Sequence, residues 1–341
     1  MSEVDPQAAS ERRRRLVGVK LRALVSEHLG ETSIEEPVGF APGAALRHRE
    51  AAWVLLDDRP AGRLGAALAW ALRAGASCLH LIADTEADAG VLARRGEAFT
   101  MPITVWRSDG RKLVRSKATE LSISQPAPDS HEELRELIIA GGADPVVEHG
   151  VLFGEVRGLE VCRVVEDRYR DVVRLEVGVG AHDREAFEMM HGDVPTVESL
   201  ARIVQAVKSQ RDLGASPHPL NRLGAERLLR WRIEQTPGSV GAVELFPAPP
   251  PTPRPNLKDA VPCVATGVDQ NGQPLRVVCA VGVDLDLIPF AADARLAGEV
   301  VEPDLAGVER LVVVTPSRDR LPVVDQLAGL LRQPAVLISV D

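Results

Sequence analysis

Two glutamates in the middle of the chain have the residue type and the spacing of a metal site. Glu160 lies in the apolar stretch 158–165, Glu176 lies in the apolar stretch 172–179, and the polar segment 166–170 separates them. This pattern predicts a β-hairpin with one carboxylate on each strand. A carboxylate among apolar residues needs water, a cationic side chain or a metal ion, and carboxylate oxygens suit Mg²⁺. One hypothesis is that Glu160 and Glu176 bind Mg²⁺ and activate water against a phosphodiester.

The elements expected around this hairpin are a helix at 131–140, a strand at 151–155 and a helix at 184–190. In this order of elements, residues 131–191 resemble the core of the PD-(D/E)XK (restriction-endonuclease-like) nuclease superfamily. The resemblance implies a Mg²⁺-dependent nuclease fold for this part of the chain, which is roughly a fifth of its length.

The resemblance also implies roles for particular residues. Glu160 takes the place of the first strand acid, Glu176 begins the E-x-K element, and Glu148, expected near the end of the preceding helix, supplies an additional acid. Gly178 stands where the superfamily has its catalytic lysine, and His182 and Arg184 are the candidates to replace that lysine. An inactive relative fits this departure as well as an active one.

The same residues have a simpler interpretation. Alternation of Glu160 and Glu176 with Val and Leu is typical of a half-exposed antiparallel sheet, in which Arg163 and Arg174 pair with the acids across the strands. Under this alternative the carboxylates hold the sheet together and bind no metal.

Residues 202–232 form a basic island with a local charge of +5 in a chain of net charge −9. Two helices are expected here, joined by a Gly- and Pro-containing segment. Arginine and lysine are the residues that contact phosphates in DNA and RNA, although their stems also cover apolar surface on ordinary helices. The candidate nucleic-acid-binding residues are Lys208, Arg211, Arg222, Arg227 and Arg230.

Two further clusters of charge are weaker candidates. Arg12 to Arg15 open an amphipathic helix at 10–30, either as a solvated helix start or as an arm for a nucleic acid or a partner. Asp284 and Asp286, with Asp293 nearby, have the spacing of a cation site but also that of a strand end turning into a loop.

Composition limits the alternatives. The chain has 341 residues, 45% of them hydrophobic, and no apolar run near the length of about 20 residues that a membrane span needs. The four cysteines are far apart and form no CxxC or Cys/His pattern, so we expect reduced thiols and a cytoplasmic protein. No P-loop, complete dinucleotide-binding fingerprint or G-x-S-x-G element occurs, which disfavours ordinary nucleotide-binding enzymes and α/β hydrolases.

Strand and helix signals alternate along the chain and predict an α/β fold. The expected order is an N-terminal helix and loop at 1–48, a βαβαβ domain at 49–117, an α+β domain with a basic helical pair at 131–240, a Pro-rich linker at 247–258 and a small α/β domain at 259–341. Six prolines between 247 and 255 make the linker the clearest expected boundary. The βαβ stretches around Leu79–Asp84 and Leu311–Pro316 have nearly equal lengths, as a duplication would give, although any two βαβ units of this size look alike.

Two functional hypotheses follow. The first is a nucleic-acid-acting protein, a divergent or inactive Mg²⁺-dependent nuclease that uses DNA or RNA. The alternative is a non-catalytic α/β protein that acts through a protein partner or by forming a homo-oligomer.

Overall fold

The computed structural model describes residues 6–41, 43–167, 171–180, 184, 197–212, 214–215, 218–254, 256, 259–307 and 309–341. The chain divides into two compact units. The first unit contains residues 1–121, 284–293 and 321–335, and the second contains residues 122–283, 294–320 and 336–341. Helices and strands alternate along the chain, and the strands form three sheets, so the expected α/β fold is confirmed.

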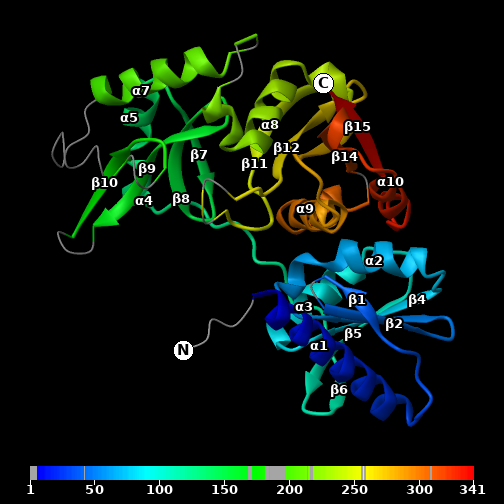
Figure 1. Ribbon diagram of the computed structural model, residues 1–341. Helices are drawn as coiled ribbons and strands as arrows, with labels where there is room; N and C mark the ends of the chain where they lie inside the picture. The colour runs from blue at the N-terminus through cyan, green and yellow to red at the C-terminus, as the bar shows by residue number, and fades with distance from the viewer. Residues whose placement is uncertain are drawn as a thin grey trace. The chain divides into compact units, whose positions relative to one another are not determined.

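A six-stranded mixed sheet lies within the first unit (Figure 1). Its strands follow one another across the sheet in chain order. Its strands are β1 (Val38–Phe40), β2 (Gly43–His48), β3 (Ala51–Leu56), β4 (Cys78–Ala83), β5 (Ile103–Asp109) and β6 (Lys112–Arg115). β3, β4 and β5 are parallel, and the other neighbours are antiparallel. The strands β1 and β2 correct the expected helix and loop at 1–48, because Gly43, Ala44 and Ala45 carry little β propensity yet pair well with β3.

Three helices belong to this sheet. The helices α2 (Leu64–Arg73) and α3 (Glu86–Gly96) connect its parallel strands, and Thr85 caps α3 by accepting a hydrogen bond from the amide of Asp88 at 3.1 Å. The expected helix at 10–30 is α1 (Pro6–Leu29), which begins before residue 10. It packs on the sheet through a shared core whose fully or nearly fully buried members include Leu21, Leu24, Val25, Trp53, Leu55 and Ile82.

Aromatic rings from three adjacent strands and α1 stack within this unit. Trp53 and His80 lie parallel, with ring centroids 3.9 Å apart, and the indole of Trp106 donates a hydrogen bond to Nδ1 of His80 at 3.1 Å. His28 of α1 meets Trp106 edge-on at 4.5 Å. Burial, together with the charge of His28, lowers the pKa of His80 to about 4, so its imidazole is neutral at physiological pH.

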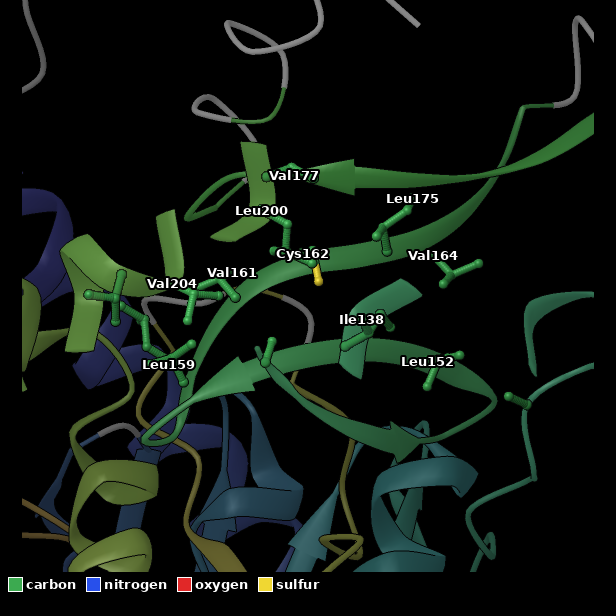
Figure 2. Packing of buried hydrophobic residues seen from close by; sticks show 14 residues of the cluster. Ile138, Leu152, Leu159, Val161, Cys162, Val164, Leu175, Val177, Leu200 and Val204 are labelled. Atoms are coloured by element: carbon green, nitrogen blue, oxygen red, sulfur yellow. The ribbon is translucent and has the colours of Figure 1, made fainter. Parts of the chain in front are cut away.

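The second unit holds an antiparallel four-stranded sheet in the order β10-β9-β8-β7. Its strands are β7 (Asp144–Glu148), β8 (Val151–Val156), β9 (Leu159–Asp167) and β10 (Val172–Val177). The helices that can be bounded among the described residues of this region are α4 (Asp129–Glu132), α5 (Arg135–Ala140) and α7 (Val197–Gln210). Side chains of α5 and α7, among them Ile138, Leu200 and Val204, pack with one face of the sheet (Figure 2).

Two expectations for this region are corrected. The helix expected at 131–140 is divided into α4 and α5. Glu148 is the last residue of strand β7 and does not belong to a helix.

A second mixed sheet completes the second unit, with its strands again in chain order. Its strands are β11 (Ala242–Ala248), β12 (Cys263–Asp269), β13 (Pro274–Cys279), β14 (Arg310–Pro316) and β15 (Ala335–Val340), and helix α8 (Ala225–Gln235) precedes them. The helix α9 (Leu287–Val301) follows β13 and its residues are divided between the two units, and α10 (Pro322–Gly329), between β14 and β15 in the sequence, belongs to the first unit. Pro247 pairs opposite Ala265 within β11, which is possible because β11 is an edge strand. The Pro-rich segment at 247–258 therefore begins inside this sheet and lies within one compact unit.

The two mixed sheets share one plan. In each, a helix precedes three antiparallel strands, the third of which runs parallel to a fourth after a crossover helix. The strands β4 and β5 begin 25 residues apart, at 78 and 103, and so do β14 and β15, at 310 and 335. The similarity of length seen in the sequence thus extends to the order and direction of the strands.

Candidate functional site: a charged face on the middle sheet

A bulge in β9 determines which side chains share a face of the four-stranded sheet. Phe153 pairs with Arg163 and Gly154 with Cys162, but Glu155 pairs with Glu160, so that Val161 is the extra residue. A β-bulge shifts the alternation of side chains by one position. Glu160 therefore lies on the same face as Arg163, whereas a regular strand would turn it toward the apolar core.

The bulge brings the two predicted metal ligands to one place. Arg163 donates to both oxygens of Glu160, at 2.7 and 2.8 Å. Arg184 joins the two acids, with Nη1 3.1 Å from Glu160 Oε1 and Nε 3.3 Å from Glu176 Oε2. Arg174 donates to Glu176 at 3.1 Å. The sequence thus identified a real pair of neighbouring carboxylates, and the cations between them are guanidinium groups.

The simpler interpretation holds in part. Arg163 and Arg174 do pair with these acids, but each pairs with the acid on its own strand. The expected half-exposed position is wrong for Glu160, which is 3% exposed. Its burial makes the arginines necessary, because a carboxylate without water requires a close positive charge.

Two more carboxylates lie on the same face, and one of them was not recognised from the sequence. Arg227 of α8 donates to both Glu148 and Glu155, and Arg230 donates to the second oxygen of Glu155 at 2.9 Å. Burial by itself would raise the pKa of Glu155, but the charges of Arg227 and Arg230 outweigh burial and lower it. The signal for Glu155 was a single acid in the strand at 151–155, without any second acid to suggest a site.

The turn between β8 and β9 allows α8 to pack closely against this face. Gly158 has φ +76°, and a Cβ atom there would lie 2.4 Å from the carbonyl carbon of Arg227. Only glycine permits this approach, which places the two arginines of α8 over the carboxylates.

This donor set does not suit a divalent cation. Glu148, Glu155, Glu160 and Glu176 all accept hydrogen bonds from arginines, and a cation would have to displace a guanidinium group. Among the residues that the structure describes, no group of three His, Cys, Asp or Glu side chains is arranged to hold a metal ion. His182, the proposed substitute for the missing lysine, lies outside the described residues.

The basic island is mostly interior. Arg211, Arg227 and Arg230 are 0%, 3% and 2% exposed. Arg211 donates to four backbone carbonyls, those of Arg157, Leu220, Leu223 and Gly224. Burial lowers its pKa to about 10, which leaves it charged at neutral pH.

Two of the five predicted phosphate contacts remain nearer the surface. Lys208 donates to the carbonyl of Gly142 at 3.2 Å, and Arg222 is exposed. The island's buried arginines therefore stabilise helices and loops, and the island presents little continuous basic surface.

The acids predicted near the C-terminus also meet arginines, here within the first unit. Asp286 pairs with Arg95 at 2.9 Å and accepts the amide of Gly65 at 2.8 Å. Asp293 accepts from Arg94 and Arg95, with its closest contact at 2.7 Å. Burial raises the pKa of Asp286 to about 6, and the charge of Arg95 opposes that rise.

The first unit also carries a groove, with a volume of about 750 Å³, between α1 and the segment that leads into edge strand β1. One wall is a single face of α1, with Arg14, Gly18 and Arg22 in one row. The other wall contains Val38 and Gly39 of β1.

No membrane-spanning candidate occurs among the helices of the described residues. No family model, no curated protein and no solved structure matches this chain.

Proposed function

We propose that this protein is a non-catalytic interaction protein that binds an extended acidic segment of a partner protein in the groove between α1 and β1. The observation that carries the proposal is the combination, in one groove, of an open strand edge, exposed apolar side chains and arginines that pair with no acid of the described residues.

The open edge belongs to β1, which has a neighbour, β2, on one side only. An edge strand presents backbone N–H and C=O groups that an extended peptide can pair with, as in β-strand addition. Gly39 leaves room for that approach, because a Cβ atom there would meet nothing within 4 Å.

The apolar contacts come from both walls. Val19 of α1 is 62% exposed and Val38 of β1 is 51% exposed, and both line the groove. A peptide strand presents every second side chain to one face, so its apolar residues can reach these valines while its backbone pairs with β1.

The charge of the groove selects an acidic ligand. Arg22 is paired with Glu36, but no acidic side chain of the described residues pairs with Arg14 or Arg15. Exposed arginines next to a strand edge favour carboxylates on the incoming segment. The valines and the strand edge favour a polypeptide over a nucleic acid, since neither recognises a phosphate backbone.

The test uses a fluorescein-labelled decapeptide of alternating glutamate and valine, with a lysine–valine peptide as its charge-reversed counterpart. We expect the fluorescence anisotropy of the acidic peptide, but not of the basic one, to rise and saturate as the protein is added. The double variant Arg14→Glu/Arg15→Glu should bind the acidic peptide at least tenfold more weakly. Arg12→Glu is the matched control, because Arg12 is an exposed arginine of the same block that does not line the groove. Equal binding by the double variant and the control would refute the proposal.

The divergent or inactive nuclease remains a second candidate, favoured by one observation: the bulge turns Glu160 and Glu176 to the same face of the sheet. Its test is Mg²⁺- or Mn²⁺-dependent cleavage of single- and double-stranded DNA and RNA. The active form of this candidate requires cleavage that Glu176→Ala abolishes without unfolding the protein. Salt-sensitive nucleic-acid binding at the Arg14/Arg15 groove, without peptide binding, would replace the peptide proposal with a binding-only form of this candidate.

A further inference from the structure

A second cavity of the first unit lies at the end of α3, beside β5 and the residues that follow β6. Its volume is about 720 Å³, which is in the range of small-molecule sites. No part of the α1–β1 groove contributes to it. From this cavity we infer a binding site for a small organic phosphate.

The floor of the cavity is apolar. Met101 and Val105 are 8% and 4% exposed, and the half-buried Ile103 lies between them in the sequence. Gly96 allows α3 to pack closely against Ile103, because a Cβ atom at this position would lie 3.2 Å from a methyl group of Ile103. Such a floor suits the carbon skeleton of a ligand.

The rim of the cavity is basic. Arg115, Lys117 and Arg332 line it and are exposed, and Glu97 is the one acid among the lining residues. Arg332 donates a hydrogen bond from Nε to the carbonyl of Glu97 at 3.0 Å, and the two terminal nitrogens of its guanidinium have no acceptor among the described residues. Three cations against one acid favour an anionic ligand, and arginine forms paired hydrogen bonds with phosphate oxygens.

One buried polar atom at this site has no partner. Ser116 lines the cavity and is 9% exposed, and its Oγ makes no hydrogen bond within the described residues. Its amide is already used, donating to the carbonyl of Val105 at 2.9 Å. A buried hydroxyl without a partner is unfavourable, and a phosphate oxygen in the cavity would supply the missing acceptor.

The inference is tested by titrating the full chain with phenyl phosphate, inorganic phosphate, benzoate and sodium chloride at matched ionic strength, followed by ¹H–¹⁵N NMR. We expect saturable shifts at residues 101, 103–105 and 115–118 with phenyl phosphate, and binding at least tenfold weaker with inorganic phosphate, which lacks a group for the apolar floor. Tighter binding of benzoate than of phenyl phosphate would reassign the site to carboxylates and overturn the inference as stated. Shifts no larger than those with sodium chloride would overturn it entirely.

Matched variants distinguish binding in this cavity from nonspecific attraction of the ligand to positive charge. Lys117→Met and Ser116→Ala should each weaken phenyl phosphate binding about tenfold, whereas Lys112→Met, on the same hairpin but outside the cavity, should not change it. Ser116→Ala should leave the melting temperature unchanged or slightly raised, because the hydroxyl that it removes has no partner. Wild-type affinity in both cavity variants would contradict the inference even if phenyl phosphate binds elsewhere.

Discussion

Glu155 and Glu160 lie directly opposite one another on β8 and β9, and both are buried, at 2% and 3% exposure. Two like charges in this position repel each other unless cations separate them. Arg227 and Arg230 bind the first carboxylate, and Arg163 and Arg184 bind the second. The face thus consists of interleaved positive and negative charges, and the loss of one member leaves its buried partners with fewer opposite charges.

Glu155→Ala should therefore destabilise the second unit strongly. Removal of this carboxylate leaves Arg227 and Arg230 without their shared acid, and breaking a buried pair in this way costs about 3–5 kcal/mol. Urea unfolding followed by circular dichroism measures the loss. The control is Glu133→Ala, at an exposed acid of the same unit, which should change the free energy of unfolding by about 0.5 kcal/mol or less. An equally small change in Glu155→Ala would mean that the network of buried charges contributes little to stability.

Arg211→Lys should lower the free energy of unfolding of the protein whether or not a ligand is present. Lysine cannot reproduce a planar donor set that reaches four carbonyls, and the acceptors left unpaired should cost about 2–4 kcal/mol. Arg222→Lys, at the exposed arginine nearby, should be neutral in the same unfolding experiment. The opposite pattern, in which Arg211→Lys retains stability but loses salt-sensitive DNA or RNA retention, would support the phosphate-binding hypothesis.

His80 should make the first unit less stable in mild acid. Its pKa is about 4 in the folded chain and about 6.5 in the unfolded chain, so between these values the unfolded state binds the extra proton. The free energy of unfolding therefore falls as pH drops from 6.5 toward 4, by roughly 2 kcal/mol from this residue after allowance for its partial exposure. The check is urea unfolding from pH 4.5 to 7.5, monitored by intrinsic tryptophan fluorescence; three of the four tryptophans, Trp53, Trp70 and Trp106, lie in the first unit. His80→Gln should flatten this pH dependence, and an unchanged slope would show that other groups cause it.

The cysteines should differ sharply in reactivity. Cys162, Cys263 and Cys279 are buried, Cys78 is partly exposed, and burial raises the pKa of Cys162 to about 12. Because the thiolate is the reactive form, iodoacetamide at pH 8 should label only Cys78 in the native protein and all four thiols in urea. Peptide mass spectrometry identifies the labelled positions. Fast native labelling of Cys263 or Cys279 would contradict the buried pairing of β12 with β13.

Local sequence patterns determined much of the fold. The βαβ stretches expected around Leu79–Asp84 and Leu311–Pro316 contain the parallel strands β4 and β14, and the strand expected at 151–155 is β8 with one further residue. Buried parallel strands are nearly continuous apolar runs, and helices repeat apolar residues every three or four positions. Both signals are contained in a few consecutive residues, so the sequence alone carries them.

The candidate site depended on tertiary structure. The sequence determined that Glu160 and Glu176 lie on adjacent strands, but only the bulge at Val161, set by pairing with β8, decided that they share a face. The sequence also showed a basic island, and only the packing of α8 over that face decided that Arg227 and Arg230 are buried partners of Glu155. Register and burial arise from contacts between residues far apart in the chain, and a local pattern carries no information about such partners.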